Sequence, residues 1–133
     1  MLGLKSSSKI STLLNWKINM KNQIQTLLNK IAQEYNDWVN DSPAYDHDHK
    51  TARNRAIKKF TESLSYETGR KYIRIFQGNS IWGFVVNTDK DKKFRKGDIL
   101  KAASWATPAR NSARGNILDG GYEISWTGPY YLK

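Results

Sequence analysis

The spacing of apolar residues changes near residue 65, from the period of a helix to that of a strand. In residues 21–40 apolar side chains recur at steps of three and four, which lines one face of an amphipathic helix. That face consists of Ile24, Leu27, Leu28, Ile31, Tyr35 and Trp38. Pro43 ends the helix because the residue before a proline is disfavoured in helical conformation. From Tyr66 onward apolar and polar residues alternate, so the sequence predicts an α+β chain with its helices first.

A second helix is predicted over residues 48–64. The Asp48 carboxylate can cap its first turn, and a negative charge suits the positive end of a helix. One side carries Ala52, Ala56, Ile57, Phe60 and Leu64, and the other carries Lys50, Asn54, Arg55, Lys58, Lys59 and Glu62. The short connection over 41–48 predicts that the two helices form a hairpin.

Short strands separated by turn residues fill the rest of the chain. They are predicted over residues 71–76, 81–87, 93–95, 99–102 and 122–127, the last paired in a hairpin with 116–118. Successive short antiparallel strands tend to close on themselves. The expected fold is therefore an N-terminal helical hairpin followed by a small antiparallel five-stranded barrel-like sheet. Residues 20–133 are expected to form this single domain, and residues 1–19 a flexible or extension segment.

Positive charge is concentrated in the C-terminal part of the chain. The protein has 22 basic and 12 acidic residues, a net charge of +10. Residues 1–49 balance five lysines against five acids, so the whole excess lies in residues 50–133. Such a field favours polyanions, namely nucleic acid, an anionic membrane surface or an acidic protein. The alternative is that a high charge only keeps a small protein soluble.

Two segments hold most of this charge. Residues 50–59 form the basic face of the second predicted helix, and residues 90–101 form a basic cluster among the predicted strands. Lysine and arginine suit a phosphate backbone, and an asparagine on the same face could reach a base edge. The side chains expected to contact nucleic acid here are Lys50, Asn54, Arg55, Lys58, Lys59, Lys92, Lys93 and Arg95.

Residues 104–116 have no regular period and are predicted to form a long loop, a kind of segment that is often functional. Trp105 supplies a plane on which a base can stack, and Arg110 and Arg114 supply guanidinium groups for phosphate. The alternative is structural: Trp105 closes the core, and residues 114–116 form a turn.

One run of four residues, Asp46, His47, Asp48 and His49, concentrates potential metal ligands. Metal sites usually gather ligands from separate elements, and the chain has no other histidine, so a solvated loop with a helix cap is favoured. The absence of cysteine excludes a disulfide framework and a catalytic thiol. No phosphate-binding glycine loop or nucleophile elbow is present. No metal, cofactor or enzymatic activity is therefore expected.

The string KGDILKAASW (Lys96–Trp105), followed by ARGN (Ala113–Asn116) and WTG (Trp126–Gly128), resembles small proteins of marine tailed phages. The likeness is to the T4-like phages of cyanobacteria in particular. Gly69–Ile73 and Phe84–Val86 also fit, so the resemblance covers about half the chain. It implies a phage origin, and because those proteins have no assigned function it brings no activity and no site residues.

These observations predict a non-enzymatic basic binding module whose partner is nucleic acid. The alternative is a phage accessory or structural protein that binds a host or virion protein. The resemblance and the aromatic tail 130–132 favour it, as does the seven-residue spacing of Ile24, Ile31 and Trp38, which would suit a dimer seam. The longest apolar run, Ile81–Val86, is far too short to cross a membrane. We expect a monomer or weak oligomer in the cytoplasm, which is the host's cytoplasm if the protein is phage-encoded.

Overall fold

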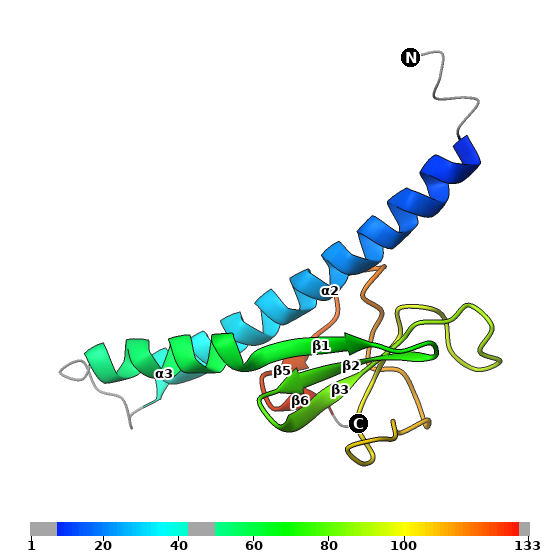
Figure 1. Cartoon of the computed structure of the whole chain (residues 1–133). Helices are drawn as coiled ribbons and strands as arrows, with labels where there is room; N and C mark the ends of the chain where they lie inside the picture. The colour runs from blue at the N-terminus through cyan, green and yellow to red at the C-terminus, as the bar shows by residue number, and fades with distance from the viewer. Residues whose placement is uncertain (1–7, 43–49, 131–133) are drawn as a thin grey trace.

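The computed structural model describes residues 8–42 and 50–130, with the backbone alone over 8–19. In this part of the chain two helices precede six short strands (Figure 1). The elements are α2 (Ser8–Asp41), α3 (Lys50–Ser63), β1 (Leu64–Thr68), β2 (Tyr72–Gln77), β3 (Ser80–Val86), β4 (Ile99–Leu100), β5 (Ile124–Ser125) and β6 (Gly128–Pro129).

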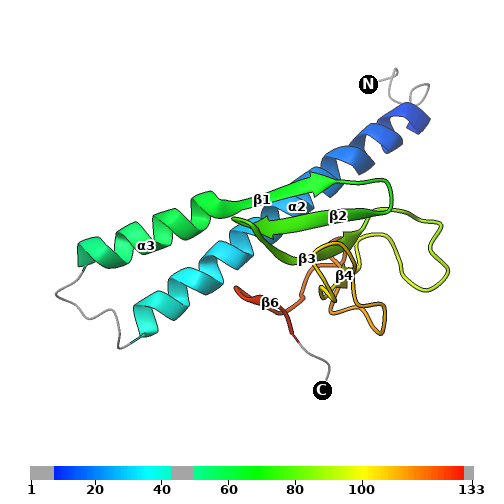
Figure 2. The same ribbon diagram turned by 60° about the horizontal axis from the view of Figure 1, so that its bottom comes forward.

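The predicted helical hairpin is present, with α3 lying beside the C-terminal half of α2 (Figure 2). Helix α2 contains all of the expected 21–40 but begins at Ser8, inside the segment expected to be an extension. Its first turns project beyond the sheet (Figure 1). Helix α3 lies within the expected 48–64. Its expected cap, Asp48, is outside the described residues.

The main core lies between α2 and one face of the sheet, which we call the inner face. Four of the six residues on the predicted apolar side of α2 are buried, namely Ile24, Leu27, Leu28 and Ile31. They pack with inner-face residues that include Ile73, Ile75 and Val85. Trp38, at the end of the same side, is 46% exposed. Periodicity therefore identified the buried face correctly over its first two turns.

The sheet has four antiparallel strands in the order β1-β2-β3-β4, and β5 and β6 form a separate pair. Strand β1 follows α3 without a loop and was not predicted as a strand. It pairs along its whole length with β2, from Leu64 opposite Gln77 to Thr68 opposite Ile73. A register shift beside Ile75 and Phe76 marks a bulge between β2 and β3.

The expected five-stranded barrel is wrong. Residues 93–95 form no strand, and β4 is only two residues long. Strand β5 pairs with β6 rather than with 116–118, because the chain reverses at Trp126–Thr127. Over the described residues the sheet remains open between β1 and β4. Helix α2 covers the apolar inner face, so closure of the sheet is not needed to bury it.

The opposite, outer face of the sheet is covered in part by loops instead of helices. Phe84, Val86 and Leu100 form a small second core there with Phe94, which comes from the β3–β4 connection. The segments around this core have little regular structure. They are held by hydrogen bonds between backbone groups of the loops and strands.

Candidate functional site

A pocket of about 480 Å³ lies beside the β1–β2 turn. This turn is at the end of the sheet farthest from α3 (Figure 1). The pocket is formed by the β1–β2 turn, the β3–β4 connection and the segment around residue 110. We call it the basic pocket, because five of its seven lining residues are cations. The lining residues are Arg70, Lys71, Thr88, Lys90, Asp91, Lys92 and Arg110.

Asp91 is the only acid in this lining, and its charge is already compensated. Its side chain is 2% exposed and accepts hydrogen bonds from Arg110 Nη2 at 3.0 Å and from the backbone N–H groups of Lys93 at 2.8 Å and Phe94 at 3.0 Å. The Arg110 hydrogen bond, aided by these two amides, holds the pKa of Asp91 far below its ordinary value. Asp91 is thus an ionised anchor for the loop and leaves the other cations available.

Those other cations, Arg70, Lys71, Lys90 and Lys92, are exposed and form no ion pair among the described residues. Four uncompensated positive charges around one hollow make a site for an anion, and a fixed arginine adds directed donors. The sequence predicted Lys92 and Arg110 here. It missed Arg70 and Lys71, of which Lys71 was predicted only as the first residue of a strand.

Arg110 is fixed by contacts on several sides. Its Nη1 atom donates to the Tyr72 hydroxyl at 2.5 Å, and its guanidinium carbon lies 4.9 Å from the centre of the Phe94 ring. Lys93 Nζ donates to the Arg110 carbonyl oxygen at 2.6 Å. Lys93 therefore holds the Arg110 backbone, and Arg110 presents its remaining donors in one orientation.

Trp105 stands at the tip of a small hairpin within the predicted loop. Ala102 and Pro108 form a β-bridge, and the turn between them is closed by backbone hydrogen bonds between Ser104 and Thr107. The Trp105 side chain is 54% exposed, so it does not close the core. Its ring lies over the outer face of β2.

Two predicted phosphate ligands have structural partners instead. Arg95 makes a two-pronged ion pair with Asp119, at 2.8 and 3.0 Å. The Arg114 side chain donates to three acceptors, the carbonyls of Tyr130 and Ser112 and the Asn111 side chain. Arg114 therefore fastens the C-terminal segment to the loop. The turn expected over 114–116 as the structural alternative is not formed, because these residues pair with 98–99 instead.

The KGD and ARGN strings form one interlocked turn. The buried Asn116 side chain donates to Asp98 Oδ1 and to the Lys96 carbonyl, both at 2.9 Å. Gly97 has φ +90°, and a Cβ atom there would lie 2.8 Å from Asn116 Oδ1, so this position requires glycine. Backbone bonds from Ile117 N to Gly97 O and from Ile99 N to Gly115 O complete the lock. These strings are therefore explained by packing.

The predicted helix residues are exposed on α3 at the other end of the molecule (Figure 1). They are Lys50, Asn54, Arg55, Lys58 and Lys59. Eight residues of α3 follow Arg55, and β1 continues in nearly the same direction. At about 1.5 Å per helical residue and about 3.3 Å per strand residue, roughly 30 Å separates Arg55 from the basic pocket. The structure thus does not bring the two basic clusters together.

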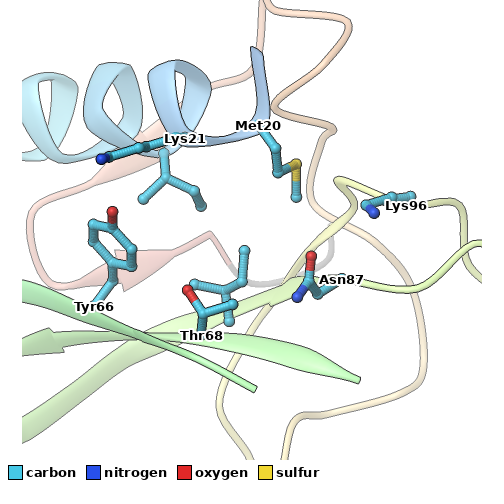
Figure 3. A pocket seen from close by; sticks show the side chains of 8 residues that line it. Met20, Lys21, Tyr66, Thr68, Asn87 and Lys96 are labelled. Carbon is cyan, nitrogen blue, oxygen red and sulfur yellow. The ribbon is translucent and has the colours of Figure 1, made fainter. Parts of the chain in front are cut away.

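A second cavity of about 380 Å³ lies between α2 and the inner face of the sheet (Figure 3). Met20, Ile24 and Ile73 form its apolar part, and polar side chains surround them. The polar lining residues are Lys21, Tyr66, Thr68, Asn87 and Lys96. Asn87 Nδ2 donates to the Gly69 carbonyl at 2.8 Å, which fixes one side of the cavity.

No cluster of three or more metal-binding side chains occurs in residues 20–42 and 50–130. The run Asp46–His49 lies outside the described residues. Among the helices that the structure describes, none combines the length and apolar character needed to span a bilayer.

The chain belongs to a family of unknown function, DUF7717, whose model matches residues 14–131. The match includes α2 from its second turn onward, the sheet, the basic pocket and the interlocked turn. No curated protein and no solved structure gives a significant match to the chain.

Proposed function

We propose that the protein is a non-enzymatic module that binds nucleic acid through the basic pocket. The observation that carries this proposal is the convergence of Arg70, Lys71, Lys90, Lys92 and Arg110 on one hollow whose only carboxylate, Asp91, is neutralised from within. A polyanion would contact several of these cations at once. It would release the counterions that they hold in solution, which is the main source of affinity for a phosphate backbone.

The lysines and Arg110 would contact phosphate in different ways. Lysines act as mobile point charges and suit a phosphate chain that lies in more than one register. Arg110, held by Asp91 and Tyr72, can offer its free donors to one phosphate in a defined direction. Lys93 was predicted as a ligand, but its Nζ atom donates to the Arg110 carbonyl oxygen and so holds the Arg110 backbone in place.

The test is fluorescence anisotropy with labelled single- and double-stranded oligonucleotides, repeated over a salt series. Reversal of both Lys90 and Lys92 to Glu should lower affinity by about tenfold or more and flatten the dependence on salt, because fewer phosphates are contacted. The matched control reverses Lys58 and Lys59 to Glu. It makes the same change in net charge on α3, at the other end of the molecule.

A specific role for the pocket requires the Lys90/Lys92 variant to lose clearly more affinity than the Lys58/Lys59 variant. Equal losses would mean that the net charge attracts nucleic acid without a site. Binding only at very low salt in the unaltered protein would have the same meaning.

A second candidate function is protein binding through an aromatic cluster where α2, α3 and β5–β6 meet. Tyr35 stacks on Phe60 with ring centres 4.0 Å apart, and Trp38 lies 5.0 Å from Trp126. Because Trp38 is 46% exposed, the cluster presents an aromatic edge to solvent. In this second proposal the protein is a phage accessory or structural protein, and the aromatic edge contacts a host or virion protein. A Trp38→Ser variant that dissociates an oligomer, measured by light scattering, would favour it over nucleic-acid binding.

A further inference from the structure

The outer face of β2 carries a continuous row of aromatic and basic side chains that the basic pocket does not include. Tyr72, Arg74 and Phe76 alternate along the strand and therefore point to the same side. Trp105 reaches over this row from its hairpin. We call these four residues the outer strip.

Within the strip, the Trp105 ring packs against Arg74 and Phe76. The Arg74 guanidinium carbon lies 4.8 Å from the Trp105 ring centre, and the Phe76 ring lies 5.9 Å from it at 42°. Because Trp105 remains 54% exposed, these contacts cover the residue only in part. A large aromatic group held in this way at the tip of a closed turn has already lost most of the conformational freedom that binding would cost.

The strip and the basic pocket are connected. A groove of about 230 Å³ runs between them. On one side it is lined by Tyr72 and Arg74 of β2 and by Lys71, which directly precedes β2, and on the other by Ala106, the neighbour of Trp105. Lys71 also lines the basic pocket, and the Tyr72 hydroxyl is bonded to Arg110. A chain that leaves the pocket over Lys71 would therefore meet Arg74 and Trp105 next.

We infer that the ligand is a single-stranded nucleic acid whose phosphates occupy the basic pocket and whose next bases stack on Trp105 along the outer strip. This inference rests on the proposed function and narrows it. A stacking platform needs the flat face of a base, which is exposed in a single strand and covered in a duplex. A groove lined by cations beside an aromatic platform is the arrangement by which proteins bind single strands without reading their sequence.

One acidic side chain opposes this use of the strip. Glu67 of β1 lies opposite Arg74 and pairs with it at 2.9 Å, and its side chain is 62% exposed. A phosphate near Arg74 would have to compete with this carboxylate. Removal of the Glu67 charge should therefore strengthen the binding of a single strand.

The experiment compares Kd values for oligothymidylate and oligouridylate of roughly 15 nucleotides, near the upper site size of a single-strand-binding domain, with a duplex of equal length. Trp105→Ala should weaken single-strand binding at least about fivefold and leave duplex binding unchanged. Trp105→Phe is the matched control, because it keeps an aromatic face and should retain most of the affinity. Glu67→Gln should raise single-strand affinity. The two probes show whether the strand is DNA, RNA or either.

Equal loss of single-strand and duplex affinity in Trp105→Ala, or no loss in either, would overturn the inference. So would a fall in affinity in Glu67→Gln, which changes an exposed side chain. If the unaltered protein binds duplex as tightly as a single strand, the inference fails and the proposed function stands. If it binds no oligonucleotide at about 0.15 M salt, the proposed function itself fails.

Discussion

The two faces of the sheet are stabilised in different ways. The inner face is covered by α2, and residues such as Leu27, Ile31 and Ile75 are completely buried there. The loops that cover the outer face and those beside β4 depend on hydrogen-bonded polar pairs: Asp91 with Arg110 on the outer face, and Asn116 with Asp98 next to β4. Apolar burial is non-directional, whereas each hydrogen-bonded pair fixes a particular loop in a particular position.

This difference explains where binding side chains can stand. A helix that packs one side against a core exposes the other side, but the cations on that side are spread along the length of the helix, as on α3. Loops that are fixed by hydrogen-bonded side chains can bring cations from three separate segments to one hollow, as in the basic pocket. The surface proposed to bind nucleic acid therefore lies on the face with the less apolar core.

The largest expected effect comes from the inner face. Ile31→Ala should lower the free energy of unfolding by about 2–5 kcal/mol, because it leaves a cavity between α2 and the sheet. Ile31→Val is the graded control and should cost about 0.5–1.5 kcal/mol. Urea denaturation at neutral pH measures both. Similar small losses in the two variants would show that α2 is only loosely packed on the sheet.

The next effect comes from the interlocked turn. Asn116→Ala should lower the free energy of unfolding by about 1–3 kcal/mol, since it leaves the buried Asp98 carboxylate and the Lys96 carbonyl without a donor. Asn79→Ala, in the exposed β2–β3 turn, is the control and should be close to neutral. If Asn116→Ala is also neutral, hydrogen-bonded polar pairs do not hold these loops, and the loop side of the sheet is not stabilised differently from the side that α2 covers.

The smallest effect is a dependence on pH at Asp91. Because its pKa in the folded protein is below the ordinary 3.8, the carboxylate stabilises the fold at pH values above about 4, and this contribution declines as the pH falls further. Asp91→Asn should therefore have a lower unfolding midpoint than the unaltered protein at pH 7, and the gap should narrow below about pH 4. Asp89→Asn, an exposed change in the same loop, is the control. A gap that is constant with pH would mean that the Arg110–Asp91 pair does not carry the effect.

Much of the helical part was predictable from local pattern. The three- and four-residue spacing identified α2 and its buried side because a helix buries its apolar stripe whatever the partner is. The alternation in Tyr72–Gln77 gave β2, and the apolar run in Ser80–Val86 gave β3. Strand β1 was missed because it follows α3 directly, with no turn residue to mark the change.

The arrangement of the strands and of the site was not predictable in the same way. Closure into a barrel or coverage by a helix would satisfy the same alternating pattern, and only the packing of α2 on the inner face decides between them. Lys92, Arg110 and Trp105 were predicted as ligands from the chemistry of their side chains alone. Asp119, which pairs with Arg95, and Tyr130, one of the three acceptors of Arg114, come from distant segments. Among the described residues no ion pair engages Arg70 or Lys71.

The sequence by itself thus determined an α+β chain, the buried side of its main helix and the excess of positive charge after residue 49. These depend on composition and on neighbours along the chain. The tertiary structure decided which cations are compensated, that the helix and loop clusters lie far apart, and that Trp105 stands in the open beside a basic groove. Those properties depend on which distant residues meet, and local spacing carries no information about that.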